Sequence, residues 1–84
     1  MKSRTANEKL YKDFYSRSGQ VKGLITGTIP LETEMVLHLH YRYEKTLKDV
    51  ALIIGKSISI VYNHHNRGLY MLEKYLNQQE INNP

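Results

Sequence analysis

Apolar residues recur every three or four positions along much of this 84-residue chain, the spacing that places side chains on one face of an α-helix. The first such segment covers about residues 6–25, and Tyr11 and Tyr15 lie beside its apolar stripe. The stripe consists of Leu10, Phe14, Val21, Leu24 and Ile25. Gly19 is expected to kink or break this helix, because glycine costs about 1 kcal/mol in a helix interior.

A second helix is predicted over about residues 31–42, where it would bury Met35, Val36 and Leu39. Residues 27–30 form a linker before it. Pro30 favours an extended conformation at Ile29, which separates the two helices.

Two further helices are predicted at about residues 47–54 and 58–76, joined by a three-residue turn. The first has Leu47, Val50, Ala51 and Ile54 on one side. Thr46 can cap its start, and Gly55 follows its last apolar residue, where a positive φ is commonly needed. Ser57 can cap the second helix. The polar tail, residues 77–84, is expected to fray.

The second helix of this pair has a continuous apolar face, formed by Ile58, Val61, His65, Gly68 and Leu72. The small side chain of Ala51 would let Val61 approach closely where the two helices cross. Ile60 then points elsewhere. A further stripe either closes the core or forms a dimer seam, and it consists of Leu69, Leu72, Tyr75 and Leu76.

These elements predict one compact all-α domain of four to five helices over residues 1–84, with no second domain. A basic N-terminal helix (1–27) would precede a helix-turn-helix core (31–76) whose second helix starts at about residue 58, and a polar tail (77–84) would follow. A domain of this size buries roughly 60–65% of the surface of its unfolded chain, so only modest stability is expected.

Composition narrows the possible classes of protein. The chain has no cysteine, which excludes disulfides and thiolate metal sites. No apolar run approaches the roughly 20 residues of a membrane span, and no signal-peptide pattern is present. We therefore expect a soluble cytoplasmic protein without membrane contact.

The net charge of +4 is unevenly distributed. Residues 1–30 carry six basic and two acidic side chains, whereas residues 31–84 carry six of each sign. The segment from Val50 to Leu72 nevertheless has Lys56 and Arg67 and no acidic residue. The helix pair is thus locally positive, and the basic N-terminal helix is either a second phosphate-binding surface or a solvated helix face.

Over residues 31–76 the chain resembles the fourth conserved region of bacterial sigma factors and related stand-alone helix-turn-helix regulators. The resemblance rests on residues at fixed offsets. These are Leu31, Glu34, Val36, Leu37, Leu39, Thr46, Leu47, Asp49, Val50, Ala51, Gly55, Ser57, Val61, His64, Arg67, Gly68 and Leu72. Ile58 and Ile60 depart from the pattern, because the family often has charged or polar side chains there. An exposed Ile60 would contact either a thymine methyl group or a protein partner.

This resemblance implies binding to upstream promoter DNA at a −35-type element, with RNA polymerase as a second partner. Residues 1–30 contain nothing similar to the sigma region that recognises and melts the −10 element. The expected class is therefore a sequence-specific transcription regulator of the kind found in phages and mobile elements, rather than a complete sigma factor. A homodimer is also considered, because one recognition helix spans only a few base pairs.

A recognition helix meets base edges through its N-terminal residues, and the predicted base contacts are therefore Ser59, Tyr62, Asn63 and Asn66. Asn63 is the strongest candidate, because a carboxamide can pair with adenine N6 and N7. The predicted phosphate contacts are Lys56, Ser57 and Arg67, which would fix the position of the protein on the duplex.

Other chemistry has little support in the sequence. His38 and His40 are two residues apart and would not face each other on a helix, so no metal site or cofactor is expected. No nucleophile has a matched base and acid, so no catalytic role is expected. Most tyrosines are expected in the core or at its boundary rather than stacked on single strands. The alternative function is a protein-interaction module that docks on RNA polymerase or another regulator without reading DNA.

Overall fold

The computed structural model describes residues 4–18 and 29–82, and within these ranges the chain is helical with no β-strand. The elements are α1 (Arg4–Ser18), α3 (Leu31–Leu37), the π-helical turn η1 (His38–Arg42), α4 (Leu47–Ile54) and α5 (Ile58–Asn82). The predicted all-α class is therefore confirmed for the described part of the chain.

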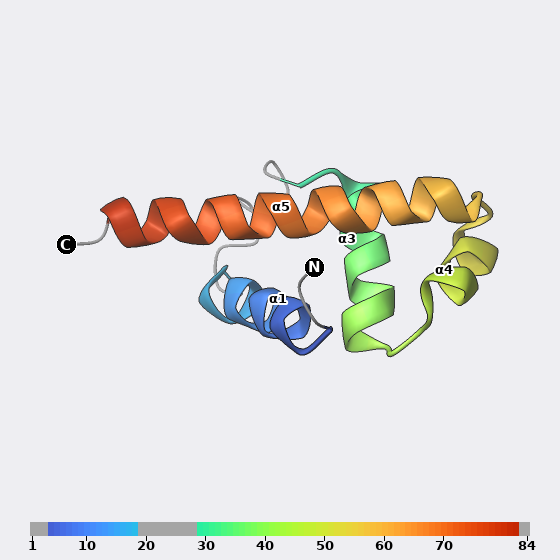
Figure 1. Ribbon diagram of the computed structural model, residues 1–84, viewed down its shortest axis with the longest axis horizontal. Coiled ribbons are helices and arrows are strands. Elements are labelled where there is room, and N and C mark those ends of the chain that lie inside the picture. Colours follow the sequence, from blue (N-terminus) through green and yellow to red (C-terminus); the bar gives the residue numbers. More distant parts are fainter. Residues whose placement is uncertain (1–3, 19–28, 83–84) are drawn as a thin grey trace.

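The long helix α5 organises the fold, because α1, α3 and α4 all contact it. Figure 1 shows α4 beside the start of α5 at one end of the molecule, with α3 near the middle and α1 farther along. The first half of α5 is thus held by α3 and α4, and its second half by α1.

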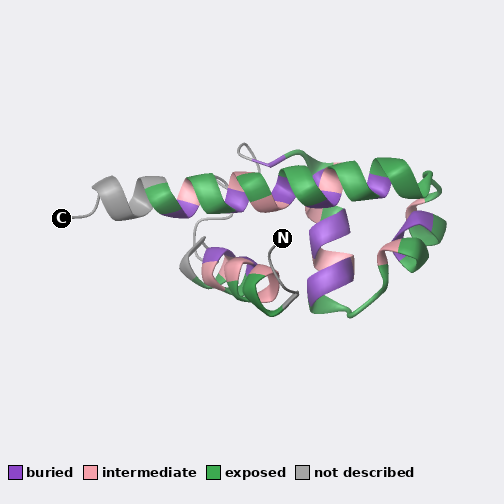
Figure 2. Cartoon of the chain, viewed as in Figure 1, coloured by how far each residue is buried: buried purple, intermediate pink, exposed green. Residues whose placement is uncertain are grey.

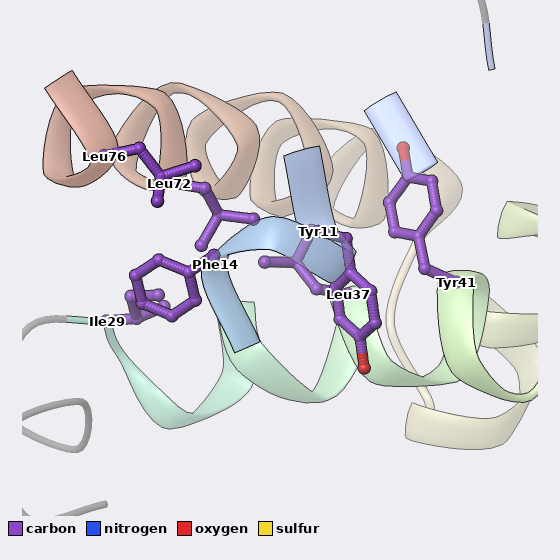
Figure 3. Packing of buried hydrophobic residues seen from close by; sticks show 7 residues of the cluster. All are labelled: Tyr11, Phe14, Ile29, Leu37, Tyr41, Leu72 and Leu76. Carbon is purple, nitrogen blue, oxygen red and sulfur yellow. The ribbon is translucent and has the colours of Figure 1, made fainter. Parts of the chain in front are cut away.

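The larger hydrophobic core joins α1, α3, η1 and α5 (Figure 3). Its buried members are Tyr11, Phe14, Ile29, Leu37, Tyr41, Leu72 and Leu76. Leu69 and Tyr75 pack against this cluster, and the ring centroids of Phe14 and Tyr75 are 4.9 Å apart. The stripe on the second half of α5 therefore closes the core of its own chain.

A second core cluster supports the turn between α4 and α5. It consists of Val36, Val50, Ala51 and Val61, with Leu39, Leu47 and Ile54 partly buried against it. Ala51 and Val61 lie in the same cluster, as expected from the small side chain of Ala51. Burial of these residues fixes α4 against the start of α5.

Gly68 lets α3 approach α5 closely. A Cβ atom built at Gly68 would lie 2.9 Å from Leu37 Cδ1 and 3.0 Å from Thr33 Cγ2. Both neighbours are buried. Glycine is thus required here for space rather than for backbone conformation.

Two core predictions are wrong. Met35 is 42% exposed, because the buried face of α3 is formed by Thr33, Val36 and Leu37. Ile58 is 44% exposed, because it is the first residue of α5 and the helix reaches the core one turn later, at Val61. The other members of the predicted apolar face, Val61, His65, Gly68 and Leu72, are buried.

Helix bounds also differ from the prediction. The first predicted helix is described from Arg4 to Ser18, and its remaining predicted positions, including Val21, Leu24 and Ile25, lie outside the described residues. The last predicted helix ends later than residue 76, because α5 continues to Asn82. No glycine or proline interrupts residues 77–82, and glutamine and glutamate favour helix.

The predicted helix over residues 31–42 changes its hydrogen bonding halfway. After Leu37 the turn widens into η1, and the Tyr43 N–H donates to the carbonyl oxygen of His38 at 3.1 Å. This five-residue spacing is that of a π-helix.

The helix pair α4 and α5 has the predicted capping residues. The Thr46 hydroxyl accepts from the backbone N–H of Asp49 at 3.1 Å, and the Ser57 hydroxyl accepts from that of Ile60 at 3.3 Å. Gly55 has φ 71°, in the left-handed region. A hydroxyl group therefore caps the start of each helix, and glycine ends α4.

Gly55→Ala is expected to destabilise the domain by about 1–2 kcal/mol, because an L side chain is strained at positive φ. A Cβ atom at Gly55 has no neighbour within 4 Å, so steric crowding does not contribute. Gly55→Asn is the matched control, since asparagine tolerates this conformation better. Urea denaturation followed by circular dichroism measures the free energy of unfolding, and we expect a larger loss for Gly55→Ala than for Gly55→Asn. Equal losses of stability would contradict the assignment of the effect to the positive φ.

Candidate nucleic-acid interface

The exposed face of α5 carries all four predicted base contacts. Ser59, Tyr62, Asn63 and Asn66 are all exposed, and they are spaced by three, one and three residues. This spacing places them on one side of a helix with 3.6 residues per turn. The buried residues Val61, His65 and Gly68 occupy the other side, and exposed and buried positions alternate along α5 in Figure 2.

The predicted phosphate contacts lie beside this face. Lys56 is exposed in the turn before α5, and Arg67 is exposed one residue after Asn66. Ser57 is also exposed, but its hydroxyl oxygen already caps α5. We name the surface formed by Lys56, Ser59, Tyr62, Asn63, Asn66 and Arg67 the polar face of α5.

Asn66 differs from Asn63, because its side chain already has a partner. The Nδ1 atom of His65 lies 3.1 Å from the Oδ1 atom of Asn66. A carbonyl oxygen only accepts, so Nδ1 carries the proton, and His65 Nε2 accepts from the buried Tyr41 hydroxyl. Asn66 therefore has its amide N–H groups available for a ligand, while its oxygen is engaged.

Two lysines near the polar face were missed by sequence reasoning. Lys45 and Lys48 line a groove between the start of α4 and the start of α5. Tyr62 and Ile58 line the same groove, and both lysines are exposed. Lys48 could have been identified from the sequence as a basic residue in the first turn of the first helix of the predicted pair.

His64 connects the other side of α5 to α3. Its Nδ1 atom lies 2.9 Å from the hydroxyl oxygen of the buried Thr33, and its Nε2 atom lies 3.7 Å from Glu32 Oε1. His64 thus has a packing role between two helices, which the sequence did not indicate.

Tyrosines of α1 anchor that helix to α3 and η1. The Tyr11 hydroxyl lies 2.6 Å from His38 Nδ1, and the Tyr15 hydroxyl donates to Glu34 Oε2 at 2.9 Å. Tyr11 and Tyr41 are buried, as expected for core tyrosines. Tyr43 is instead exposed, with the Arg42 guanidinium 5.9 Å from its ring centroid.

The positive charge of α1 is partly neutralised within the helix. Lys12 Nζ lies 3.3 Å from Glu8 Oε1, and the two residues are four apart. Exposed pairs of this kind contribute little to stability. This ion pair fits the interpretation of α1 as a solvated face at this position.

Burial shifts the pKa values of the groups between α1 and η1. Burial lowers the pKa of His38, and the nearby Glu34 partly offsets this effect. Burial also raises the pKa values of Tyr11 and Tyr15 above their ordinary value of 10.0, and for Tyr15 the hydrogen bond to Glu34 adds to the rise. Neutral forms of these side chains therefore hold α1 in place.

Acid is expected to destabilise the fold through His38. Its pKa in the folded chain lies below the ordinary value of 6.5, so the unfolded chain binds the proton more readily. Stability present above pH 6.5 is then lost as the pH falls through the folded-state pKa. Urea denaturation at several pH values at and below 6.5 measures this loss of stability. The loss on acidification is expected to be smaller for His38→Gln than for the unchanged protein. Equal pH dependence for both proteins would contradict this assignment.

The hydrogen bonds described for His38 and His40 go to different groups. His38 contacts Tyr11, whereas His40 Nδ1 lies 2.7 Å from the carbonyl oxygen of Lys45. Within residues 4–18 and 29–82, no group of three or more His, Asp or Glu side chains is placed to hold a metal ion. In the same part of the chain, no helix combines the length and apolar character needed to cross a membrane.

Comparison with known proteins found no matching family model, no matching curated protein and no matching solved structure.

Proposed function

We propose that this protein is a sequence-specific double-stranded DNA-binding transcription regulator, with α4 and α5 acting as a sigma region 4-like helix-turn-helix. The observation that carries the proposal is the polar face of α5. Its exposed hydroxyl, phenol and carboxamide groups can meet base edges, and the exposed cations Lys56 and Arg67 lie beside them.

The packing around α5 supports the same proposal. The second core cluster fixes α4 and the start of α5, so the polar side chains are presented on a rigid helix. Figure 1 shows this pair at one end of the molecule, beyond α3. A major groove, which admits an α-helix, can therefore receive the start of α5 while α4 crosses the backbone.

Binding to duplex DNA is expected to depend steeply on salt, because neutralised phosphates release counterions. Lys56→Gln and Arg67→Gln should each reduce the slope of log K against log salt by about 0.9, with similar losses for all sequences. Fluorescence anisotropy at several salt concentrations measures the slope.

Lys74→Gln is the matched control for these substitutions. Lys74 is exposed on the same helix, 16 residues after Ile58, which corresponds to about 24 Å along the axis. We expect an unchanged slope for this variant. Absence of binding to a pooled duplex library at low salt would refute the proposed function.

Exposed apolar residues near the turn favour a second candidate, a module that docks on RNA polymerase or another regulator. Leu52 and Ile53 on α4 are 75% and 54% exposed, and Ile60 on α5 is 41% exposed. Contiguous apolar exposure often marks a protein-interaction surface.

A pull-down with purified bacterial RNA polymerase after nuclease treatment separates the two candidates. Docking would be supported if the protein retains polymerase, if Leu52→Glu abolishes this retention, and if the protein has no affinity for duplex DNA. Duplex binding that Leu52→Glu leaves unchanged would support the DNA-binding regulator.

A further inference from the structure

We infer that the polar face of α5 recognises A·T base pairs, with Asn63 reading adenine and Ile60 contacting a thymine methyl group. This inference rests on the proposed function, and it specifies the class of DNA site. It follows from which chemical groups α5 presents and from where along the helix they lie.

Residues 58–66, about two and a half turns of α5, include neither of the residue types that most commonly read guanine. The commonest specific contact to guanine is a bidentate bond from arginine or lysine to O6 and N7. Arg67 lies nine residues after Ile58, about 13.5 Å farther along the helix axis, where the helix leaves the groove and meets phosphates.

This face also has no acidic side chain, the residue type that reads cytosine. The N4 amino group of cytosine is read by the carboxylates of glutamate or aspartate. The sequence has no acidic residue between Val50 and Leu72. A G·C pair beneath the first turns of α5 would thus offer hydrogen-bonding groups that no charged side chain here matches.

Asn63 supplies the complementary pair for adenine. A carboxamide accepts from adenine N6 and donates to N7 at the same time. Asn63 is exposed, whereas the Asn66 oxygen is already engaged by His65. Asn63 is therefore the carboxamide on this face with which we expect both adenine bonds, because the Asn66 oxygen already accepts one hydrogen bond from His65.

Ile60 provides the apolar contact for thymine. It lies three residues before Asn63, so the two side chains are neighbours along the helix surface, and 41% of Ile60 is exposed. The C5 methyl group of thymine is the apolar feature of the major groove. An adenine under Asn63 and a thymine methyl under Ile60 use both side chains without desolvating a charge.

Selection of bound duplexes from a random library tests the inference with the full chain. We expect A·T pairs at the contacted positions, and replacing one of these pairs by G·C should weaken binding by roughly 5- to 150-fold. Replacing thymine by deoxyuridine removes only the methyl group and should weaken binding about fourfold, the effect of one buried methyl group. Ile60→Ala should abolish this sensitivity to deoxyuridine, with folding verified by circular dichroism.

The outcomes distinguish this inference from the proposed function. Selected duplexes with fixed G·C pairs at the contacted positions would overturn the inference and leave DNA binding intact. An A·T preference that persists in both Asn63→Ala and Ile60→Ala would also overturn it, because the preference would then come from DNA shape. If no duplex binds at all, the proposed function itself fails.

Discussion

Leu72→Ala is expected to lower the free energy of unfolding by about 2–5 kcal/mol. Leu72 is fully buried between α1, α3 and α5, in the cluster that contains Phe14 and Leu37 (Figure 3). Truncation removes apolar contacts and leaves a cavity. Because small domains are stabilised by only about 5–15 kcal/mol, this loss is a large fraction of the total and should shift the midpoint of unfolding to a clearly lower urea concentration. Urea denaturation followed by circular dichroism measures the loss.

Leu52→Ala is the matched control for Leu72→Ala. The chemical change is identical, but Leu52 is 75% exposed on α4. Its effect should stay within about 0.5 kcal/mol, as for most surface substitutions. Comparable losses for both variants would contradict the placement of α5 against α1 and α3.

Asn63→Ala is expected to abolish discrimination at one base pair, with a loss of about 1–3 kcal/mol for the preferred duplex. The physical reason is the removal of a side chain that accepts from N6 and donates to N7 of the same adenine. Affinity for non-specific DNA should change little, because phosphate contacts supply it. Anisotropy titrations against the preferred duplex and a single-pair variant measure the difference.

Asn66→Ala serves as the comparison for Asn63→Ala. Its oxygen is engaged by His65, so we expect a smaller loss of base discrimination. Asn66→Ala should also lower the free energy of unfolding slightly, because His65 loses one hydrogen-bond partner. A larger loss of discrimination at Asn66 than at Asn63 would contradict the assigned roles.

Local sequence signals predicted most of the framework. Thr46, Gly55 and Ser57 have strong conformational or capping preferences. The helix ends that they define lie where expected. Apolar spacing correctly placed Val61 and Leu72 on the buried side of α5. These features depend on residues within a few positions of one another, so a single sequence contains them.

Features that depend on distant contacts were harder to predict. Met35 and Ile58 fit their apolar patterns, but burial depends on which part of each helix the neighbouring helices cover. The partners of His38 and His64 are 27 and 31 residues away along the chain. Periodicity contains no information about such pairs. The predicted site residues are exposed as required for binding, while their contacts with DNA stay predictions.

The separation of polar and buried residues on opposite sides of α5 affects how this protein can evolve. Substitutions at Ser59, Tyr62 or Asn63 alter side chains that the core does not need, so new target sequences can arise without loss of folding. Asn66 is the exception, because its bond to His65 continues through Tyr41 into the larger core. We therefore expect directed evolution to diversify the first three positions readily and to retain asparagine at the fourth.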